Sequence, residues 1–298
     1  MRSRSTPAAP EANWWDGIAD NEAFVREAYL VALGREGDPA GVALHVEKLA
    51  EGWTRADVVS VLSDSKEATA GPVPRLALDA FHGSRVTWIR SLPPARRILD
   101  LGGTCLGDDR GALVAMGYPY QFEDLVIIEL PEDDRHELYK LPENSAVDSG
   151  RGPVRYLYRS MTDLADLPDR SFDMICSGQT FEHIYPDEGA KLLHDVRRLL
   201  TPDGVLALDT PNGAMTSIQA SEQGEQFINP DHKVEYTHQQ MLALFADAGL
   251  RLVREHGIGY LPATAASGTF ELMDLVENPG LYADIERSYT LAYLATPA

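Results

Sequence analysis

The sequence has few cysteines and few basic residues, and each shortage excludes a class of protein. Cys105 and Cys176 each stand alone among 298 residues, so they build neither a disulfide framework nor a thiolate zinc site. Lysine and arginine together number 26 against 46 aspartates and glutamates, which gives a formal net charge of −20. Because nucleic acids and anionic membranes are bound through basic residues, we expect neither as a partner.

Long apolar stretches are missing as well. No window approaches the roughly 18 apolar residues of a membrane span, and the arginines within residues 1–12 precede no apolar stretch of the kind found in a secretory signal. The hydrophobic share of 44% is ordinary for a globular protein. We therefore expect a soluble, reduced, cytoplasmic protein whose oligomeric state is open. Residues 1–20, rich at first in Pro, Ala and Ser, are expected to be disordered or extended.

Residues 21–72 are expected to form a small all-helical accessory domain. Apolar residues recur at helical spacing between positions 24 and 32, a turn at 37–39 leads into a second helix, and Thr54 caps a third. No residue of this segment has an evident chemical role. The Gly- and Pro-rich residues 71–74 mark its boundary.

Short motifs gather in this domain: LGRE at 33–36, DPAG at 38–41 and SKE at 65–67, together with Tyr29 and Gly52. They resemble a helical domain of unknown function that is often found beside bacterial glycan-modifying enzymes. The resemblance implies a neighbourhood in saccharide chemistry and no mechanism.

Residues 73–298 alternate short apolar runs with helical or loop segments, the pattern of a parallel sheet built from βα units. The clearest helix spans 189–200, with its leucines on one face. Further helices are expected at 76–91 and at 239–248, the latter opened by a capping box of Thr237 and Gln240. Seven strands are expected, at 97–101, 125–129, 154–159, 172–177, 204–209, 250–255 and 288–295.

Ligands of an open α/β sheet bind at the carboxyl ends of its strands, so the residues there are the first candidates for a site. The first strand ends in Asp100-Leu101-Gly102-Gly103, whose glycines allow the backbone to approach a ligand closely. The second ends in Glu129, where a carboxylate can accept hydrogen bonds from a ribose diol. Asp163 follows the third strand, and Ser177 lies at the end of the fourth.

A nicotinamide dinucleotide matches these loops poorly. Its Gly-x-Gly-x-x-Gly fingerprint is met at 102–107 only by the first and last glycine. Glu129 also comes later than the acidic residue expected about 20 positions on. The sequence therefore favours another cofactor.

Four segments of the second part of the chain resemble one family when they are taken together and in this order: RRILDLGG, SMTDLADLPDRSFDMICSGQTFEHI, LLHDVRRLLTPDGVLALDTPN and DHKVEYTHQQMLALFADAGLRLVREHGIGYLP. Together they resemble the class I S-adenosylmethionine-dependent methyltransferases over residues 75–298. The resemblance implies S-adenosylmethionine as the cofactor. It also implies an α/β fold with a Rossmann-like, doubly wound sheet of seven strands, the last of them antiparallel.

The same resemblance implies a set of cofactor-binding residues: Asp100, Gly102 and Gly103 around the methionyl part, Glu129 at the ribose hydroxyls, Asp163 and Leu164 at the adenine, and Ser177. Two features depart from the family. Thr104 and Leu106 stand where further glycines are usual. The long interval before Glu129 leaves Glu123 and Asp124 as alternatives for the ribose.

Methyl transfer mainly requires alignment of nucleophile, methyl carbon and sulfur, but an alcohol acceptor benefits from a general base. Two histidines are predicted to be catalytic, His232 in the loop after the fifth strand and His183 after the fourth. We expect the neighbouring Asp231 to orient the His232 ring. The structural alternatives are a solvated His232 and a His183 that packs or caps a helix. Tyr236 and Glu235 share the loop and are as well explained by structural roles.

Other suggestive residues are assigned plain roles. The acidic pairs at 108–109 and 133–134 are interpreted as solvated surface, and we predict no metal. The aromatic pairs at 14–15 and 81–82 are expected to fill hydrophobic gaps rather than to line the cofactor pocket.

The sequence thus predicts a methyltransferase that O-methylates a hydroxyl of a saccharide or glycosylated small molecule, in natural-product or glycan biosynthesis. The acceptor class is inferred only from the glycan-modifying enzymes beside which domains similar to the helical domain are often found. Two alternatives stay open: an N- or C-methyltransferase of another metabolite, and a non-catalytic module that binds S-adenosylmethionine.

Overall fold

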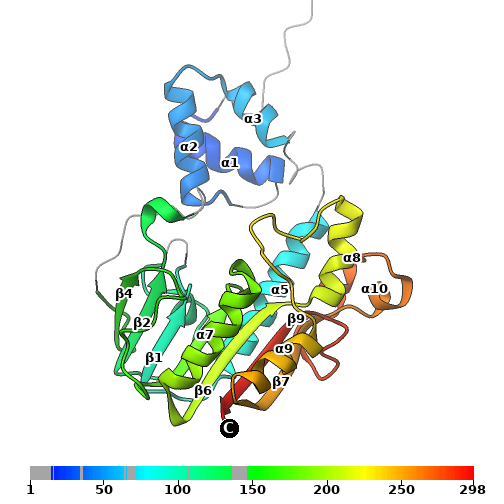
Figure 1. Ribbon diagram of the computed structural model, residues 1–298. Helices are drawn as coiled ribbons and strands as arrows, with labels where there is room; N and C mark the ends of the chain where they lie inside the picture. The colour runs from blue at the N-terminus through cyan, green and yellow to red at the C-terminus, as the bar shows by residue number, and fades with distance from the viewer. Residues whose placement is uncertain are drawn as a thin grey trace, which may run out of the picture. The chain divides into compact units, whose positions relative to one another are not determined.

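The computed structural model describes Trp15 and residues 17–33, 36–63, 65, 72–105, 108–135 and 146–298 (Figure 1). The chain divides into two compact units, Met1–Leu76 and Ala77–Ala298. Of residues 1–20, expected to be disordered or extended, residues 1–14 and 16 lie outside the described residues, as do Gly34 and Gly71, and the others form no helix or strand. None of the described helices combines the length and the apolar character needed to cross a membrane.

The first unit is the expected small helical domain. It contains α1 (Asn21–Leu33), α2 (Pro39–Ala50) and α3 (Arg55–Ser63). Asp38 caps α2, because its Oδ1 accepts a 2.8 Å hydrogen bond from the Gly41 N–H. Apolar side chains from all three helices form one core: Phe24, Val25, Ala28, Tyr29, Val42, Val58 and Leu62.

The second unit is built on one mixed sheet in the order β3-β4-β2-β1-β5-β6-β9-β7-β8. The strands β1, β2, β4, β5 and β6 run parallel, whereas β9 lies antiparallel between β6 and β7. Among the described residues the strands are β1 (Arg97–Leu101), β2 (Asp124–Glu129), β3 (Val147–Asp148), β4 (Pro153–Tyr158), β5 (Phe172–Gly178), β6 (Leu200–Pro211), β7 (Leu250–Tyr260), β8 (Leu281–Tyr282) and β9 (Ser288–Pro297).

The part of the second unit that the structure describes has two strands more than the seven expected. The seven predicted strands all form, and the last is antiparallel as expected. The two further strands, β3 and β8, have two residues each and pair antiparallel at the two edges of the sheet. Segments this short carry no periodic pattern, so sequence alone could not reveal them.

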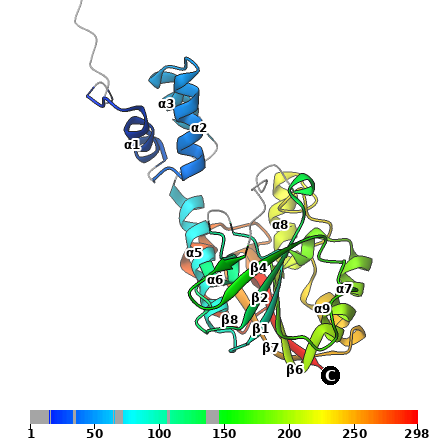
Figure 2. The ribbon, with the colours of Figure 1, turned by 90° about the vertical axis from the view of Figure 1, so that its left-hand side faces the viewer.

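Helices cover both faces of the sheet (Figure 2), with α7 and α9 on one side and α5 and α6 on the other. Side chains of β1 alternate between the two resulting cores: Leu99 and Leu101 join the core with α7, and Ile98 joins the core with α5. Strands buried on both faces are typical of a doubly wound sheet. The helices of this layer arrangement are α5 (Pro72–Arg90), α6 (Ala112–Ala115), α7 (Pro186–Leu199), α8 (Gly213–Gln223), α9 (His238–Asp247), α10 (Pro262–Ser267) and α11 (Met273–Glu277).

Candidate functional site

The loop after β1 runs close to the side chain of Asp100 and requires glycine at two positions. Gly102 has a φ of +70°, and a Cβ there would lie 2.5 Å from Cγ2 of Thr180. At Gly103 a Cβ would overlap the Asp100 carboxylate. The Gly102 N–H donates a 2.8 Å hydrogen bond to the carbonyl of Ile128, which ties this loop to the end of β2. The backbone of Gly102 and Gly103 is therefore held against the Asp100 carboxylate, at the end of the strand where a ligand is expected.

Asp100 is a buried acid that accepts no hydrogen bond from any described residue. Its side chain lines a pocket and the residue is only 4% exposed, and no described residue donates to its carboxylate. Burial above all, and then repulsion from Asp209 and Glu129, raises the pKa of Asp100 to about 7, while Arg85 acts in the opposite direction. A carboxylate in this condition suits a ligand that brings its own cationic donors.

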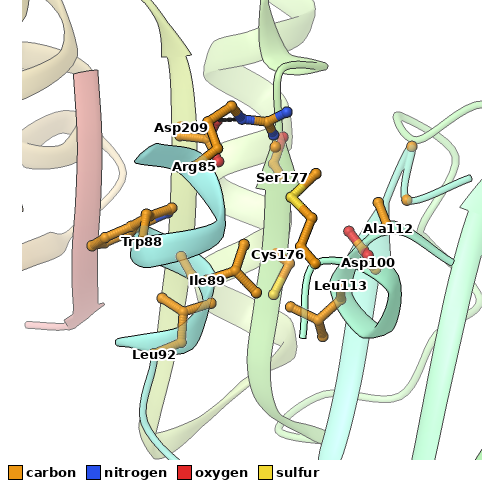
Figure 3. A pocket seen from close by; sticks show the side chains of 15 residues that line it. Arg85, Trp88, Ile89, Leu92, Asp100, Ala112, Leu113, Cys176, Ser177 and Asp209 are labelled. Atoms are coloured by element: carbon orange, nitrogen blue, oxygen red, sulfur yellow. Dashed lines mark hydrogen bonds and ion pairs between the residues drawn. The ribbon is translucent and has the colours of Figure 1, made fainter. Parts of the chain in front are cut away.

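Asp209, near the carboxyl end of β6, shares this pocket with Asp100. Its Oδ2 accepts a 2.9 Å hydrogen bond from Arg85 Nε (Figure 3). The same oxygen accepts a 3.0 Å hydrogen bond from Gln179 Nε2. Gln179 has a φ of +58°, a costly backbone conformation for a residue with a Cβ. A 2.8 Å hydrogen bond from the Gln179 N–H to the Asp209 carbonyl helps to hold this strained backbone in place.

The pocket has an apolar side too. Trp88, Ile89 and Leu92 of α5 and Leu113 of α6 line it, as Figure 3 shows. The pocket thus joins an apolar wall to a rim of two buried acids.

Two polar residues of this pocket, Asp209 and Arg85, are not among the residues predicted from the sequence. Asp209 could have been found, since it ends the expected strand at 204–209, where ligand contacts concentrate. Arg85 lies inside α5, and no local pattern marks it.

Glu129 ends β2 at the ligand-binding edge of the sheet. Its side chain is half-buried, and Oε1 accepts a 2.8 Å hydrogen bond from the Leu130 N–H. The alternatives lie at the other end of the strand, where Glu123 accepts from Arg96 Nε at 2.8 Å and Asp124 pairs with Arg155 Nη2 at 2.8 Å. Glu129 is thus the acid of these three that lies near Asp100.

The remaining predicted cofactor contacts differ in exposure. Asp163 is exposed, whereas Leu164 is fully buried in the core beneath α7. Ser177 is buried, lines the pocket, and shares a 2.9 Å hydrogen bond with Thr180 Oγ1. Thr180 in turn donates to the Leu101 carbonyl at 2.9 Å, so this contact links β5 to the end of β1.

A second group of polar residues lies beyond β5, which we call the histidine–glutamate cluster: Glu182, His183, His232 and Glu235. Glu182 and His183 belong to the short helix η3 (Phe181–His183), and the other two belong to the loop before α9. The Lys233 N–H donates to the Glu182 carbonyl at 2.8 Å and holds the two segments together. Both predicted catalytic histidines therefore meet, with ring centroids 4.8 Å apart.

The cluster is largely closed to solvent. Glu182 is 1% exposed and His232 is 7% exposed. Burial raises the pKa of Glu182 to about 7, although hydrogen bonding and the neighbouring His232 act in the opposite direction. Burial and the neighbouring His232 lower the pKa of His183, against the raising effect of Asp231, whose backbone it also meets. His183 is therefore neutral at physiological pH.

The expected orienting partner of His232 was wrong. Glu235 rather than Asp231 holds the ring, with Oε1 2.7 Å from Nδ1. Glu235 is itself fixed, since it accepts hydrogen bonds from the Thr216 hydroxyl and from the Ile228 N–H. A residue three positions away reaches the ring because the loop turns back on itself between Asn229 and His232.

Other residues singled out in the sequence have packing or surface contacts. Trp15 packs edge-on against Phe24 with centroids 6.1 Å apart, and Phe81 packs against Tyr289 at 5.4 Å. Trp14 lies outside the described residues. Asp108 forms an ion pair with Arg110 at 2.6 Å.

Comparisons with known families give one match in the N-terminal part of the chain and a different match in the second unit. Residues 9–71 match a domain of unknown function, DUF4214. Residues 132–208 match a family described as methyltransferase domain. That second match begins after Glu129, so the loop with Thr104 in place of a glycine lies outside it. No curated protein sequence matches the chain.

Solved structures show the fold of the second unit. One is a chain from the complex between the Trm112 methyltransferase activator of Haloferax volcanii and the methyltransferase solved with it, at 17% identity and a TM-score of 0.51, covering 77% of this chain and 96% of that one. Another is a methyltransferase of Thermotoga maritima, described as a possible histamine N-methyltransferase, at 15% identity and 0.51, covering 75% and 92%. At these identities the likeness concerns the fold.

The residues present fit S-adenosylmethionine. The buried Asp100 carboxylate lacks a donor that an ammonium group would supply, and the glycine loop leaves its backbone accessible. The matched methyltransferase domain, the strand order and this donor set agree. The second unit therefore contains a methyltransferase domain, with S-adenosylmethionine as the cofactor that this domain implies, and the chain also has an N-terminal DUF4214 domain.

Proposed function

We propose that this methyltransferase acts on a hydroxyl oxygen of a saccharide or glycosylated small molecule. The observation that carries the proposal is His232, a buried imidazole with Nδ1 bound to Glu235 at 2.7 Å and Nε2 without a hydrogen bond to any described residue. An imidazole fixed in this way presents one nitrogen to accept a proton.

For the cofactor we propose the residues that the family resemblance implies. Asp100 receives the ammonium group, beside the backbone of Gly102 and Gly103. The Glu129 carboxylate accepts hydrogen bonds from the ribose hydroxyls. Asp163 and Leu164 frame the adenine, and Ser177 lines the pocket next to Asp100.

S-adenosylmethionine supplies an electrophilic methyl group on a sulfonium. With the cofactor bound, the acceptor oxygen would take the methyl carbon, and the sulfur would keep the electron pair of the broken carbon–sulfur bond. His232 Nε2 takes the hydroxyl proton, and Glu235 stabilises the imidazolium that forms. A neutral His183 in ring contact adds no competing charge.

Two features support a saccharide as the acceptor. The N-terminal domain resembles one found beside glycan-modifying enzymes. Tyr185, two residues after His183, is 58% exposed and offers a ring face next to the cluster. Lys233 Nζ lies 6.0 Å from the centroid of that ring.

The test is methyl transfer over a panel of glycosides, alcohols and amines, with the His232→Ala variant. We expect a hydroxyl of a sugar-containing acceptor to be methylated, and the variant to lose about 10²–10⁴-fold in kcat/KM, the usual contribution of a general base. Cofactor affinity should stay within about twofold, because His232 lies outside the cofactor pocket.

His194→Gln is the matched control, since His194 is exposed on α7 and, among the described residues, pairs with the exposed Asp247. It should retain full activity. Methylation confined to amine or carbon acceptors, or unchanged turnover in His232→Ala, would contradict the proposal.

A further inference from the structure

We propose that Glu182, His183 and His232 form a binding site for one divalent transition-metal ion of the Mn²⁺ or Zn²⁺ class. Each residue offers one ligand atom, a carboxylate oxygen or a ring nitrogen, and these atoms lie within 4.8 Å of one another. Among them, His232 Nε2 and Glu182 Oε1 are 4.0 Å apart, which is too far for a hydrogen bond.

The spacing fits an ion between the three ligands. At the centre of a triangle with edges of 4.8 Å, an ion would lie about 2.8 Å from each corner, whereas metal–nitrogen and metal–oxygen bonds measure about 2.0–2.2 Å. Side-chain rotations that move each ligand atom by less than about 1 Å would complete the coordination.

The surroundings of the ligands are those of a metal site. Metal-bound histidines generally engage their other ring nitrogen with a carboxylate or a backbone carbonyl. His232 meets Glu235 through Nδ1, and His183 has a hydrogen bond with the backbone of Asp231. The second oxygen of Glu182 accepts a 2.9 Å hydrogen bond from the Thr210 hydroxyl. Each of the three ligand residues is thus oriented by a hydrogen bond to a neighbouring residue.

The charge of the cluster also favours a cation. Glu182 and Glu235 have side chains only 1% and 3% exposed. Among the described residues, no lysine or arginine forms an ion pair with either. Burying two acids without a lysine or arginine partner is costly, and a divalent ion would remove that cost.

The ligand types indicate which ion. The two imidazoles suit Zn²⁺ and its transition-metal neighbours and the carboxylate suits Mn²⁺, whereas Mg²⁺ and Ca²⁺ are usually bound by oxygen ligands. With three protein ligands the ion keeps open positions for an acceptor.

The consequence for catalysis rests on the proposed function. A hydroxyl bound at an open position would be acidified by the ion and would lose its proton to solvent. In the ion-loaded protein His232 would act on the hydroxyl through the ion, as a ligand, and the proton transfer to Nε2 described above would apply to the ion-free protein.

The test uses the full chain without a polyhistidine tag. The protein is freed of metal with a chelator and then titrated with MnCl₂. Free Mn²⁺ is measured by electron paramagnetic resonance, and ZnCl₂ is then added as a competitor. We expect one Mn²⁺ per chain, displaced by Zn²⁺. Glu182→Gln and His183→Ala should weaken binding more than tenfold, and Glu235→Gln should weaken it 10–100-fold.

Glu182→Gln keeps the size of the side chain and can still accept from Thr210, so its fold is checked by its melting temperature without metal. His194→Gln is the control and should bind as the wild type does. Equal binding by the wild type and Glu182→Gln, or no binding by the wild type, overturns the proposal. Methyl transfer is not part of this readout, so a failed acceptor panel contradicts the proposed function and leaves ion binding untouched.

Discussion

At the scale of single residues, Asp100 shows how burial sets the charge of an acid. Its pKa of about 7 lies well above the ordinary value near 3.8, mainly because of burial. The native protein therefore binds a proton at pH 5 or 6 that the unfolded chain has released. This proton stabilises the native state fully below about pH 4, and the contribution is lost as pH rises through about 7.

Asp100→Asn is accordingly expected to stabilise the cofactor-free protein at pH 8. The amide resembles the neutral acid, so the two proteins should be equally stable near pH 4, and the variant should gain roughly 2–4 kcal/mol at pH 8. Urea unfolding at the two pH values measures this. A variant that is less stable at pH 8 would show that the carboxylate has a native partner.

Tyr185 is expected to bind the acceptor and to play no part in chemistry. Because its ring is exposed beside His183, Tyr185→Ala should raise the KM for a saccharide acceptor about 3–30-fold, in line with the loss of one aromatic contact, and leave kcat nearly unchanged. Tyr185→Phe should behave as the wild type. A large fall in kcat for Tyr185→Ala would place the residue in the chemical step instead.

At the scale of elements, α7 is the helix whose pattern is clearest in the sequence, and its packing follows that pattern. Leu192, Leu193, Val196 and Leu199 are buried against the sheet, while Lys191 and His194 are exposed. The helix starts three residues before its expected position, because Pro186 occupies the first turn and Glu188 Oε2 accepts from the Tyr185 N–H at 3.0 Å.

Leu193→Ala is expected to lower the free energy of unfolding by about 2–5 kcal/mol, the usual cost of a cavity in a packed core. The control Lys191→Ala, on the exposed face, should change it by less than about 0.5 kcal/mol. Denaturant titrations compare the two variants. Similar losses in both would mean that α7 is not held by its apolar face.

At the scale of the whole molecule, the pocket and the histidine–glutamate cluster belong entirely to the second unit among the described residues. That unit also contains two large cores, one on each face of the sheet. A chain that begins at Pro72 is therefore expected to fold and to bind S-adenosylmethionine within about threefold of full-length affinity. Calorimetry on both chains tests this, and a loss above tenfold would show that the helical domain contributes to the cofactor site.

The net charge of −20 excludes partners at this scale without selecting a reaction. Some of the acids nevertheless lie in the pocket and the cluster: Asp100, Asp209, Glu182 and Glu235 are buried side chains, and their low exposure distinguishes them from the acids of the surface. Composition could not make that distinction, because it counts charges without their solvation.

The sequence by itself determined what depends on local pattern. Apolar runs and helical spacing marked the seven main strands and the helix α7, since each signal lies within about ten consecutive residues. The ends of those strands then indicated Asp100, Glu129 and Ser177, because parallel strands bring their carboxyl ends to one edge.

Only the tertiary structure decided which distant side chains meet. His183 and His232 are 49 positions apart in the sequence and come together because the loop before α9 folds back onto η3. Glu235 rather than the adjacent Asp231 holds His232, and Asp209 lies beside Asp100, for the same reason. Such contacts depend on how loops return to the sheet, and no local pattern of residues records that path.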